Sequence, residues 1–136
     1  MTRNWAKDTR ILLVEDDRVA IHLYSYRLEL EGLEVVQVSN GIEALERLHQ
    51  ERFSAVISDL LMPGMSGLQL IRQIRSAGEP WRDLPILVLS ASRNEQDQMD
   101  AFRAGADDFM SKPVSAPILM ERLYRLIRPS RGPAGA

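Results

Sequence analysis

The stretch Ile11-Leu12-Leu13-Val14-Glu15-Asp16-Asp17 places a wholly apolar run directly before three adjacent acids. A short continuous apolar run predicts a strand that is buried on both faces, as in a parallel sheet covered by helices. Asp17 is of a residue type that caps helices, and it stands where a helix would begin. The stretch therefore predicts a strand over residues 10–14 and the first strand-to-helix turn of an α/β domain.

The same alternation of strand and helix patterns recurs along the chain. Further strands are expected over residues 35–38, 53–58, 85–89 and 108–111, and helices between Asp17 and Gly32 and near residues 41–51, 67–77, 94–104 and 115–128. Parallel strands joined by helices cross over with a right hand, which leaves few topologies. We expect an α/β fold with a doubly wound, five-stranded parallel sheet and five helices.

Apolar residues at helical spacing support these helices. The first helix is marked by Val19, Leu23, Tyr26 and Leu30, and the inner face of the second is expected to carry Ile42, Leu45 and Leu48.

Composition narrows the class of protein. The chain has 136 residues and no cysteine, which excludes disulfide and thiol chemistry. Its net charge of -2 argues against a bulk nucleic-acid binder, which would usually show a basic face. No apolar run approaches the roughly 20 residues that span a bilayer, and the start lacks the apolar core of a signal peptide. We expect a cytoplasmic domain over residues 10–128, with an extension at 1–9, a flexible tail at 129–136 and neither membrane nor direct nucleic-acid contact.

Four side chains that could bind a ligand or take part in a reaction stand at the ends of the expected strands: Asp16, Asp59, Ser90 and Lys112. Each alone has a plain structural explanation, such as a helix cap, a turn or a surface charge. In a parallel sheet, however, the carboxyl ends of the strands meet at one edge, where ligands bind. Two acids, a hydroxyl and a lysine at that edge suit a divalent metal and a phosphoryl group, with Asp59 as a carboxylate nucleophile.

At these residues the chain resembles the receiver domains of bacterial two-component response regulators, the CheY-like family. The matching segments are Leu13–Asp17, Asp59–Gly67, Leu89–Ala91 and Gly105–Phe109 leading into Lys112-Pro113. The resemblance implies the strand order 2-1-3-4-5. It also implies a phospho-acceptor signalling domain that is not an enzyme, beyond catalysing its own phosphorylation and dephosphorylation.

The resemblance further implies a role for each site residue. Asp59 would accept a phosphoryl group from a histidine kinase or phosphotransfer domain, and Ser90 and Lys112 would bind its oxygens. Mg²⁺ (or Mn²⁺) would be held by Asp16 and Asp59, by Glu15 through water and by the backbone carbonyl of Leu61. Phe109 would turn inward as Ser90 moves, and so change the face formed by the fourth helix, fifth strand and fifth helix.

On that face, Asp108 and Arg122 resemble a charged pair through which active receivers form homodimers. The usual acid four residues before Arg122 is Ile118 here, so an ordinary solvated pair is the slightly favoured interpretation. Three rival functions are a receiver that is never phosphorylated, a flavodoxin-like FMN protein and an aspartyl phosphatase. The acidic first loop would repel a flavin phosphate, and the chain has no room for a phosphatase cap. A stand-alone receiver and a piece of a larger regulator or hybrid kinase fit the sequence equally.

Overall fold

Five parallel strands form one sheet in the order β2-β1-β3-β4-β5, as expected. The computed structural model describes residues 4–62 and 64–128. Its strands are β1 (Arg10–Val14), β2 (Glu34–Val38), β3 (Ala55–Asp59), β4 (Ile86–Ser90) and β5 (Asp108–Ser111). The α/β fold class and the strand order are therefore confirmed.

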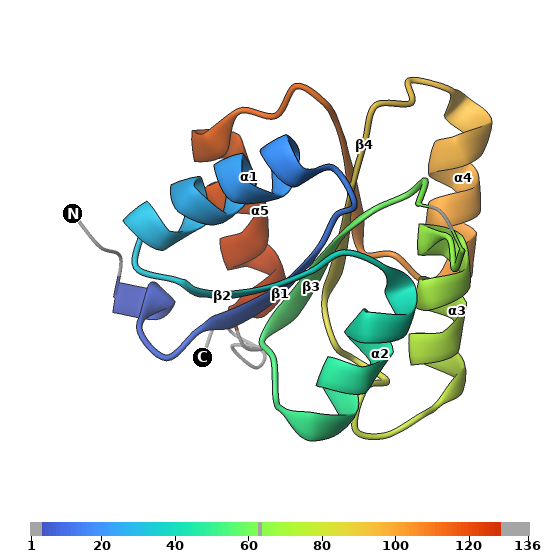
Figure 1. Ribbon diagram of the computed structural model, residues 1–136, viewed down its shortest axis with the longest axis horizontal. Helices are drawn as coiled ribbons and strands as arrows, with labels where there is room; N and C mark the ends of the chain where they lie inside the picture. Colours follow the sequence, from blue (N-terminus) through green and yellow to red (C-terminus); the bar gives the residue numbers. More distant parts are fainter. Residues whose placement is uncertain (1–3, 63, 129–136) are drawn as a thin grey trace, which may run out of the picture.

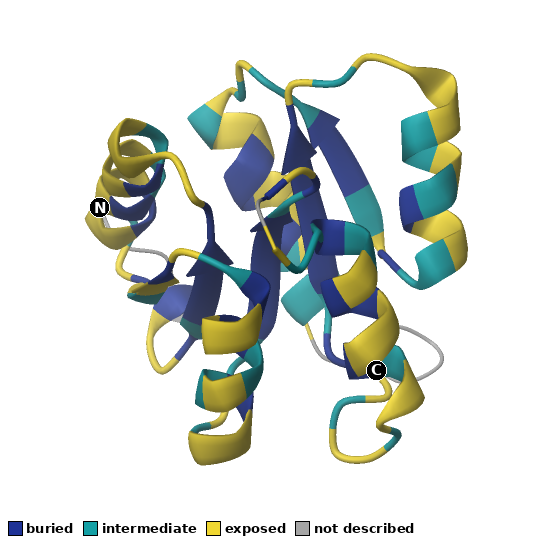
Figure 2. Ribbon diagram, turned by 45° about the vertical axis from the view of Figure 1, so that its right-hand side comes forward, coloured by how far each residue is buried: buried dark blue, intermediate teal, exposed yellow. Residues whose placement is uncertain are grey.

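Helices cover both faces of this sheet. They are η1 (Asn4–Ala6), α1 (Arg18–Leu30), α2 (Gly41–Gln50), α3 (Gly67–Ser76), α4 (Glu95–Ala104) and α5 (Ala116–Ile127). Figure 1 shows α1 and α5 on one face and α2, α3 and α4 on the other. Residues along β1 alternate between the two cores: Leu12 and Val14 pack under α2–α4, whereas Ile11 and Leu13 pack under α1 and α5. The strands β1, β3 and β4 are accordingly buried on both faces (Figure 2), whereas β2 buries only Val38.

Side-chain caps fix where the helices begin. The Asp17 carboxylate accepts from the backbone N–H groups of Val19 and Ala20 at 2.9 and 3.1 Å, and Asn40 caps α2 in the same way. Such caps satisfy N–H groups that a helix start leaves unpaired. They hold each helix start close behind the strand end and so keep the loops at this edge short.

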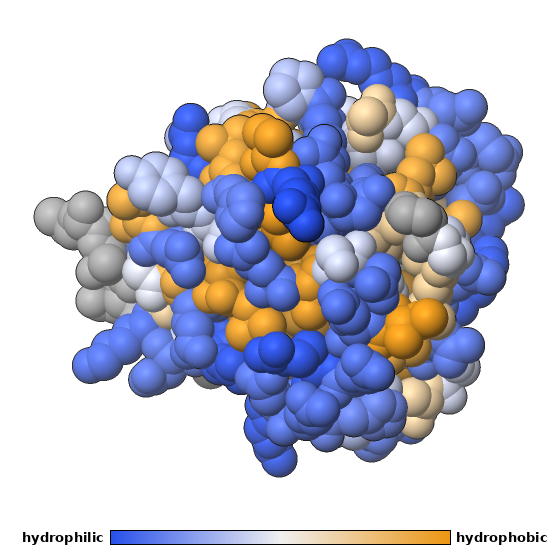
Figure 3. Space-filling view, viewed as in Figure 1, coloured by the Kyte–Doolittle hydropathy of each residue, from blue (hydrophilic) through white to orange (hydrophobic). Residues whose placement is uncertain are grey.

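The apolar stripe that predicts α1 lies on its outer face. Val19, Leu23, Tyr26 and Leu30 are 79, 49, 59 and 56% exposed, and Figure 3 shows apolar surface where α1 lies. The residues that face the sheet are Ile21, Ser25 and Leu28. The helix is thus confirmed, but its inner face follows a second stripe that the apolar repeat does not reveal.

The inward placement of Ile42 in α2 is wrong, because 58% of this residue is exposed. Gly41, Ala44 and Leu48 are the buried residues of α2. Successive helix residues are separated by about 100° around the axis, so a helix that approaches the sheet on Gly41 and Ala44 turns Ile42 outward.

The extension before β1 packs on the domain. The Trp5 ring lies 5.4 Å from the Tyr124 ring of α5, and Ala6 is fully buried. The expected tail, residues 129–136, lies outside the described residues. Among the residues that the structure describes, no helix is both long and apolar enough to cross a bilayer.

Candidate metal and phosphoryl site

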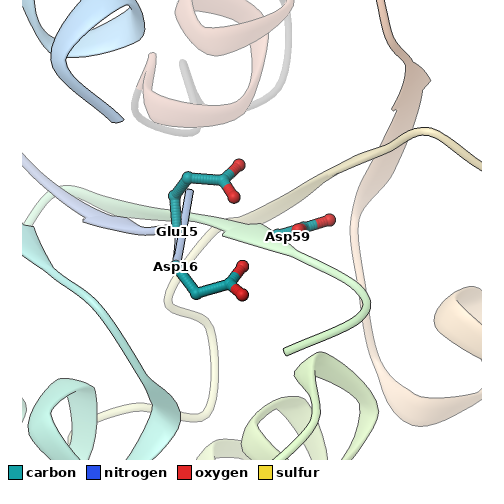
Figure 4. Close-up of side chains that lie close together, drawn as sticks. All are labelled: Glu15, Asp16 and Asp59. Atoms are coloured by element: carbon teal, nitrogen blue, oxygen red, sulfur yellow. The ribbon is translucent and has the colours of Figure 1, made fainter. Parts of the chain in front are cut away.

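Three carboxylates converge at the carboxyl edge of the sheet. Glu15 and Asp16 follow β1, and Asp59 is the last residue of β3, the strand that pairs with β1. One oxygen from each lies within 4.8 Å of the others. Figure 4 shows the three side chains reaching out on the same side of the strand ends. The clustering of acids that the strand-end pattern predicts is therefore confirmed.

The same carboxylates fit a hard divalent cation. Mg²⁺ takes oxygen ligands and keeps several of its waters. Glu15 is buried, Asp59 is partly buried and Asp16 is exposed, so the cluster is open to water on the side of Asp16. An oxygen-rich donor set with one solvent-facing side meets the needs of such an ion.

Glycine at position 67 allows α3 to begin close behind Asp59. A Cβ at Gly67 would lie 2.3 Å from the backbone oxygen of Asp59 and 2.8 Å from the Cα of Leu60. The N–H of Gly67 donates to the oxygen of Leu60 at 2.8 Å, which closes the loop after β3. A side chain at this position would push the loop away from its place beside Asp59.

Lys112, which directly follows the edge strand β5, reaches across to the acidic cluster. Its Nζ lies 2.7 Å from Oε1 of Glu15 and 3.8 Å from Oδ2 of Asp59. Its backbone N–H donates to the oxygen of Ser90 at 2.8 Å, and its peptide bond to Pro113 is cis. Burial works to lower the pKa of Lys112, but the hydrogen bond to Glu15 and the charge of Asp59 outweigh it and raise this pKa. The ammonium therefore stays charged.

The surroundings of the Asp59 carboxyl group disfavour its ionised form. Burial, followed by the nearby charge of Glu15, raises the pKa of Asp59 to about 6. Lys112 and the N–H of Leu60, which donates to Oδ1 of Asp59 at 2.8 Å, oppose the shift only in part. A positive charge added beside Asp59 would relieve this electrostatic cost.

Ser90 is the last residue of β4, and Phe109 lies on the neighbouring strand β5, where it pairs with Val88. Ser90 is 1% exposed, and its Oγ accepts a hydrogen bond from the N–H of Ser92 at 3.1 Å. Phe109 is 7% exposed and belongs to the core under α2–α4. Because the ring is already buried here, burial of Phe109 alone cannot mark the activated state. Its role in a switch stays a prediction.

Asp108 and Arg122 are bonded to each other within the chain. Arg122 Nη1 lies 3.0 Å from Oδ1 of Asp108, and the side chains are 43% and 23% exposed. Exposed pairs of this kind contribute about 0–1 kcal/mol. Asp108 and Arg122, which resemble a dimer contact, thus already form an ion pair with each other within one chain.

The strand-end pattern does not single out Tyr24, which lies against the site. The Lys112 Nζ is 5.8 Å from the centroid of its ring. The available signal is the spacing from Asp17, because seven residues are about two helical turns and place Tyr24 on the same side of α1. His22 and His49 are exposed and belong to no metal cluster among the described residues.

A five-stranded parallel sheet with an acidic cluster and a lysine at its carboxyl edge defines a phospho-acceptor signalling domain. The chain belongs to the response regulator receiver domain family, which matches residues 11–124. It is a receiver domain of the two-component type and not an enzyme in the usual sense. Receiver domains of this family work with histidine kinases.

Comparison with known proteins agrees with this family assignment. Response regulator MprA of Mycobacterium sp. (strain KMS) is 39% identical over 127 residues, which cover 91% of this chain and 54% of that protein. The chain thus spans about half the length of the curated relatives it matches.

Two solved receiver domains of histidine kinases have the same fold. The one from Syntrophus aciditrophicus has a TM-score of 0.83 and 31% identity, and covers 93% of this chain and 96% of its own. The receiver domain of PA1611 from Pseudomonas aeruginosa PAO1 has a TM-score of 0.82 and 32% identity, and the match covers 88% of this chain and 98% of that one. It holds a magnesium ion in its active-site cleft.

The raised pKa of Asp59 predicts a specific pH dependence of stability. Between about pH 4 and pH 6 the folded protein binds more protons than the unfolded chain, so the free energy of unfolding falls as pH rises through this range. Without metal, we expect Asp59→Asn to be more stable than the wild type by about 1–3 kcal/mol near pH 7.5, and by little near pH 4. Urea unfolding across this range measures the difference.

The exposed Asp83→Asn is the matched control for loss of a single negative charge. A stabilisation by Asp59→Asn that is the same at both ends of the pH range would contradict the account.

Proposed function

We propose that Asp59 accepts a phosphoryl group from the phosphohistidine of a histidine kinase or phosphotransfer domain. The proposal rests on one arrangement above all. Asp59 lies within 4.8 Å of the Glu15 and Asp16 oxygens and has the Lys112 ammonium at 3.8 Å. A carboxylate beside a cation-binding pair and a positive charge is placed to react with a phosphoramidate or an acyl phosphate.

The transfer exchanges one bond for another. A carboxylate oxygen of Asp59 attacks phosphorus, the P–N bond to the imidazole breaks, and the electron pair leaves with the histidine nitrogen, which takes up a proton. Lys112 moves its ammonium from Glu15 toward the phosphoryl oxygens. The Ser90 hydroxyl donates to another of them. Such transfer depends mainly on positioning and on stabilising charge.

Asp16 and Asp59 would hold Mg²⁺ (or Mn²⁺) directly, Glu15 through water, and Leu61 through its backbone carbonyl. When bound, the ion neutralises charge on the phosphoryl group. Support comes from the carboxylate cluster and from PA1611, a related receiver that holds magnesium in its active-site cleft.

Phosphorylation would then act on the face formed by α4, β5 and α5. The aspartyl phosphate carries about -1.5 to -2 charges beside Ser90, where the free carboxylate carries at most -1, by analogy with other phosphorylated side chains. Movement of Ser90 and Phe109 would change this face and control a downstream partner or an output domain. We place this action in the cytoplasm, in a domain spanning residues 10–128 with no nucleic-acid contact of its own.

The acceptor is identified by intact mass. After incubation with acetyl phosphate and Mg²⁺, we expect the wild type to gain one phosphoryl group and Asp59→Asn to gain none. EDTA should also abolish the gain, because the metal cluster would be empty. Asp83→Asn is the matched control and should be modified like the wild type. If acetyl phosphate and a histidine kinase both leave the wild type unmodified, the proposal fails.

The residues beside the site predict a long-lived aspartyl phosphate. Leu61 is 65% exposed and carries no polar group, and the Ser92 hydroxyl is bonded to Asp97. Neither offers an amide or acid side chain that could orient an attacking water. We expect a phosphoryl lifetime of minutes or more, measured by loss of the mass adduct after the donor is removed. Decay within seconds would show that another group orients the water.

The proposal includes a phosphorylation-dependent homodimer through α4, β5 and α5. Forming it through Asp108 and Arg122 requires that their 3.0 Å pair within the chain open or be shared. We expect beryllofluoride, a phosphoryl mimic, to raise the sedimentation coefficient of the wild type and not that of Arg122→Ala. A monomer in both would remove the dimer from the account.

A further inference from the structure

Lys112 has an aromatic neighbour in addition to its two carboxylates. Its Nζ lies 2.7 Å from Glu15, 3.8 Å from Asp59 and 5.8 Å from the centroid of the Tyr24 ring. We propose that Tyr24 is a positioning residue for phosphoryl transfer, whose ring holds the Lys112 ammonium within reach of Asp59. This inference rests on the proposed role of Asp59 as the acceptor.

The fold fixes the ring in place. Ile21, Ser25 and Leu28 turn one side of α1 into the sheet, which puts Tyr24 at the flank of this buried stripe. There the half-buried ring packs in the same apolar cluster as Val114. Val114 lies two residues after Lys112, in the connection between β5 and α5. The ring and the segment that carries the lysine therefore border the same apolar cluster and line one small pocket.

An aromatic ring suits this task better than another acid would. The lysine stem is flexible, and its shortest contact is with Glu15 and not with Asp59. A ring within about 6 Å attracts an ammonium through its negative face. That attraction does not require a hydrogen-bond acceptor, so the N–H donors of Lys112 stay available for phosphoryl oxygens.

The phenol does not act as a counter-ion. Burial raises the pKa of Tyr24, and the positive charge of Lys112 opposes the shift only in part. The hydroxyl is thus neutral at physiological pH, and the attraction belongs to the ring. Phenylalanine should serve as well as tyrosine, whereas an aliphatic side chain should not.

Three variants test this role in the full chain. With acetyl phosphate and Mg²⁺, we expect Tyr24→Leu to be phosphorylated about fivefold more slowly, which corresponds to about 1 kcal/mol. Tyr24→Phe should stay within about twofold of the wild type. Tyr26→Leu, the same change on the same helix at a residue 59% exposed, is the matched control and should match the wild type.

A second measurement reports on position without phosphorylation. In metal-free protein, the ring current of Tyr24 should shift the NMR signals of the Lys112 Hε protons. The shift should persist in Tyr24→Phe, disappear in Tyr24→Leu and be unaffected in Tyr26→Leu. A variant that only loosened the fold would not produce this selective pattern. If Tyr24→Leu does not fold, Tyr24→Met takes its place with the same expectations.

The outcomes separate the two proposals. A folded Tyr24→Leu that is phosphorylated at the wild-type rate overturns the positioning role, and so does a slow variant whose Lys112 signals are unchanged. Equal slowing in Tyr24→Phe overturns the role of the ring. If the wild type itself accepts no phosphoryl group, the role of Asp59 fails, and with it any role of Tyr24 in transfer. The NMR comparison then still decides whether the ring holds Lys112.

Discussion

The crowding of three carboxylates at one edge of the sheet is the constraint on which the site depends. Because β1 and β3 are paired and parallel, Glu15 and Asp16 must emerge beside Asp59. Burial, and after it the charge of Glu15, oppose ionisation of Asp59, which is why the pKa of Asp59 rises to about 6. The Lys112 ammonium offsets only part of this cost, so the site favours a further positive charge.

The rest of the fold keeps these groups together. Alternate residues of each strand feed two cores, and this fixes the register that brings the strand ends level. Gly67 lets α3 begin against Asp59, and the backbone bond from Lys112 to Ser90 ties the lysine to the neighbouring strand end. Removing the repulsion by neutralising an acid would leave the fold intact but take away the site's affinity for a cation.

Much of this could be predicted from the sequence, because apolar runs and their polar ends are local signals. They locate Asp59 and Lys112 at strand ends, and Asp17 at the start of a helix. Which side of a helix faces the sheet is a tertiary choice. Ile42 faces solvent because Gly41 and Ala44 let α2 approach the sheet closely, and the apolar stripe of α1 is exposed while Ser25 lies on the buried side. Side-chain partners such as Tyr24 with Lys112 depend on packing between distant segments, which no local pattern records.

The most direct test of the central claim is the Mg²⁺ dependence of the free energy of unfolding. If the clustered carboxylates form a cation site, Mg²⁺ should stabilise the wild type, by about 1.4 kcal/mol for each tenfold rise above the dissociation constant. Asp16→Asn should lose most of this gain, whereas the exposed Asp83→Asn should keep it. Equal Mg²⁺ stabilisation in all three proteins, or none in the wild type, would contradict the account.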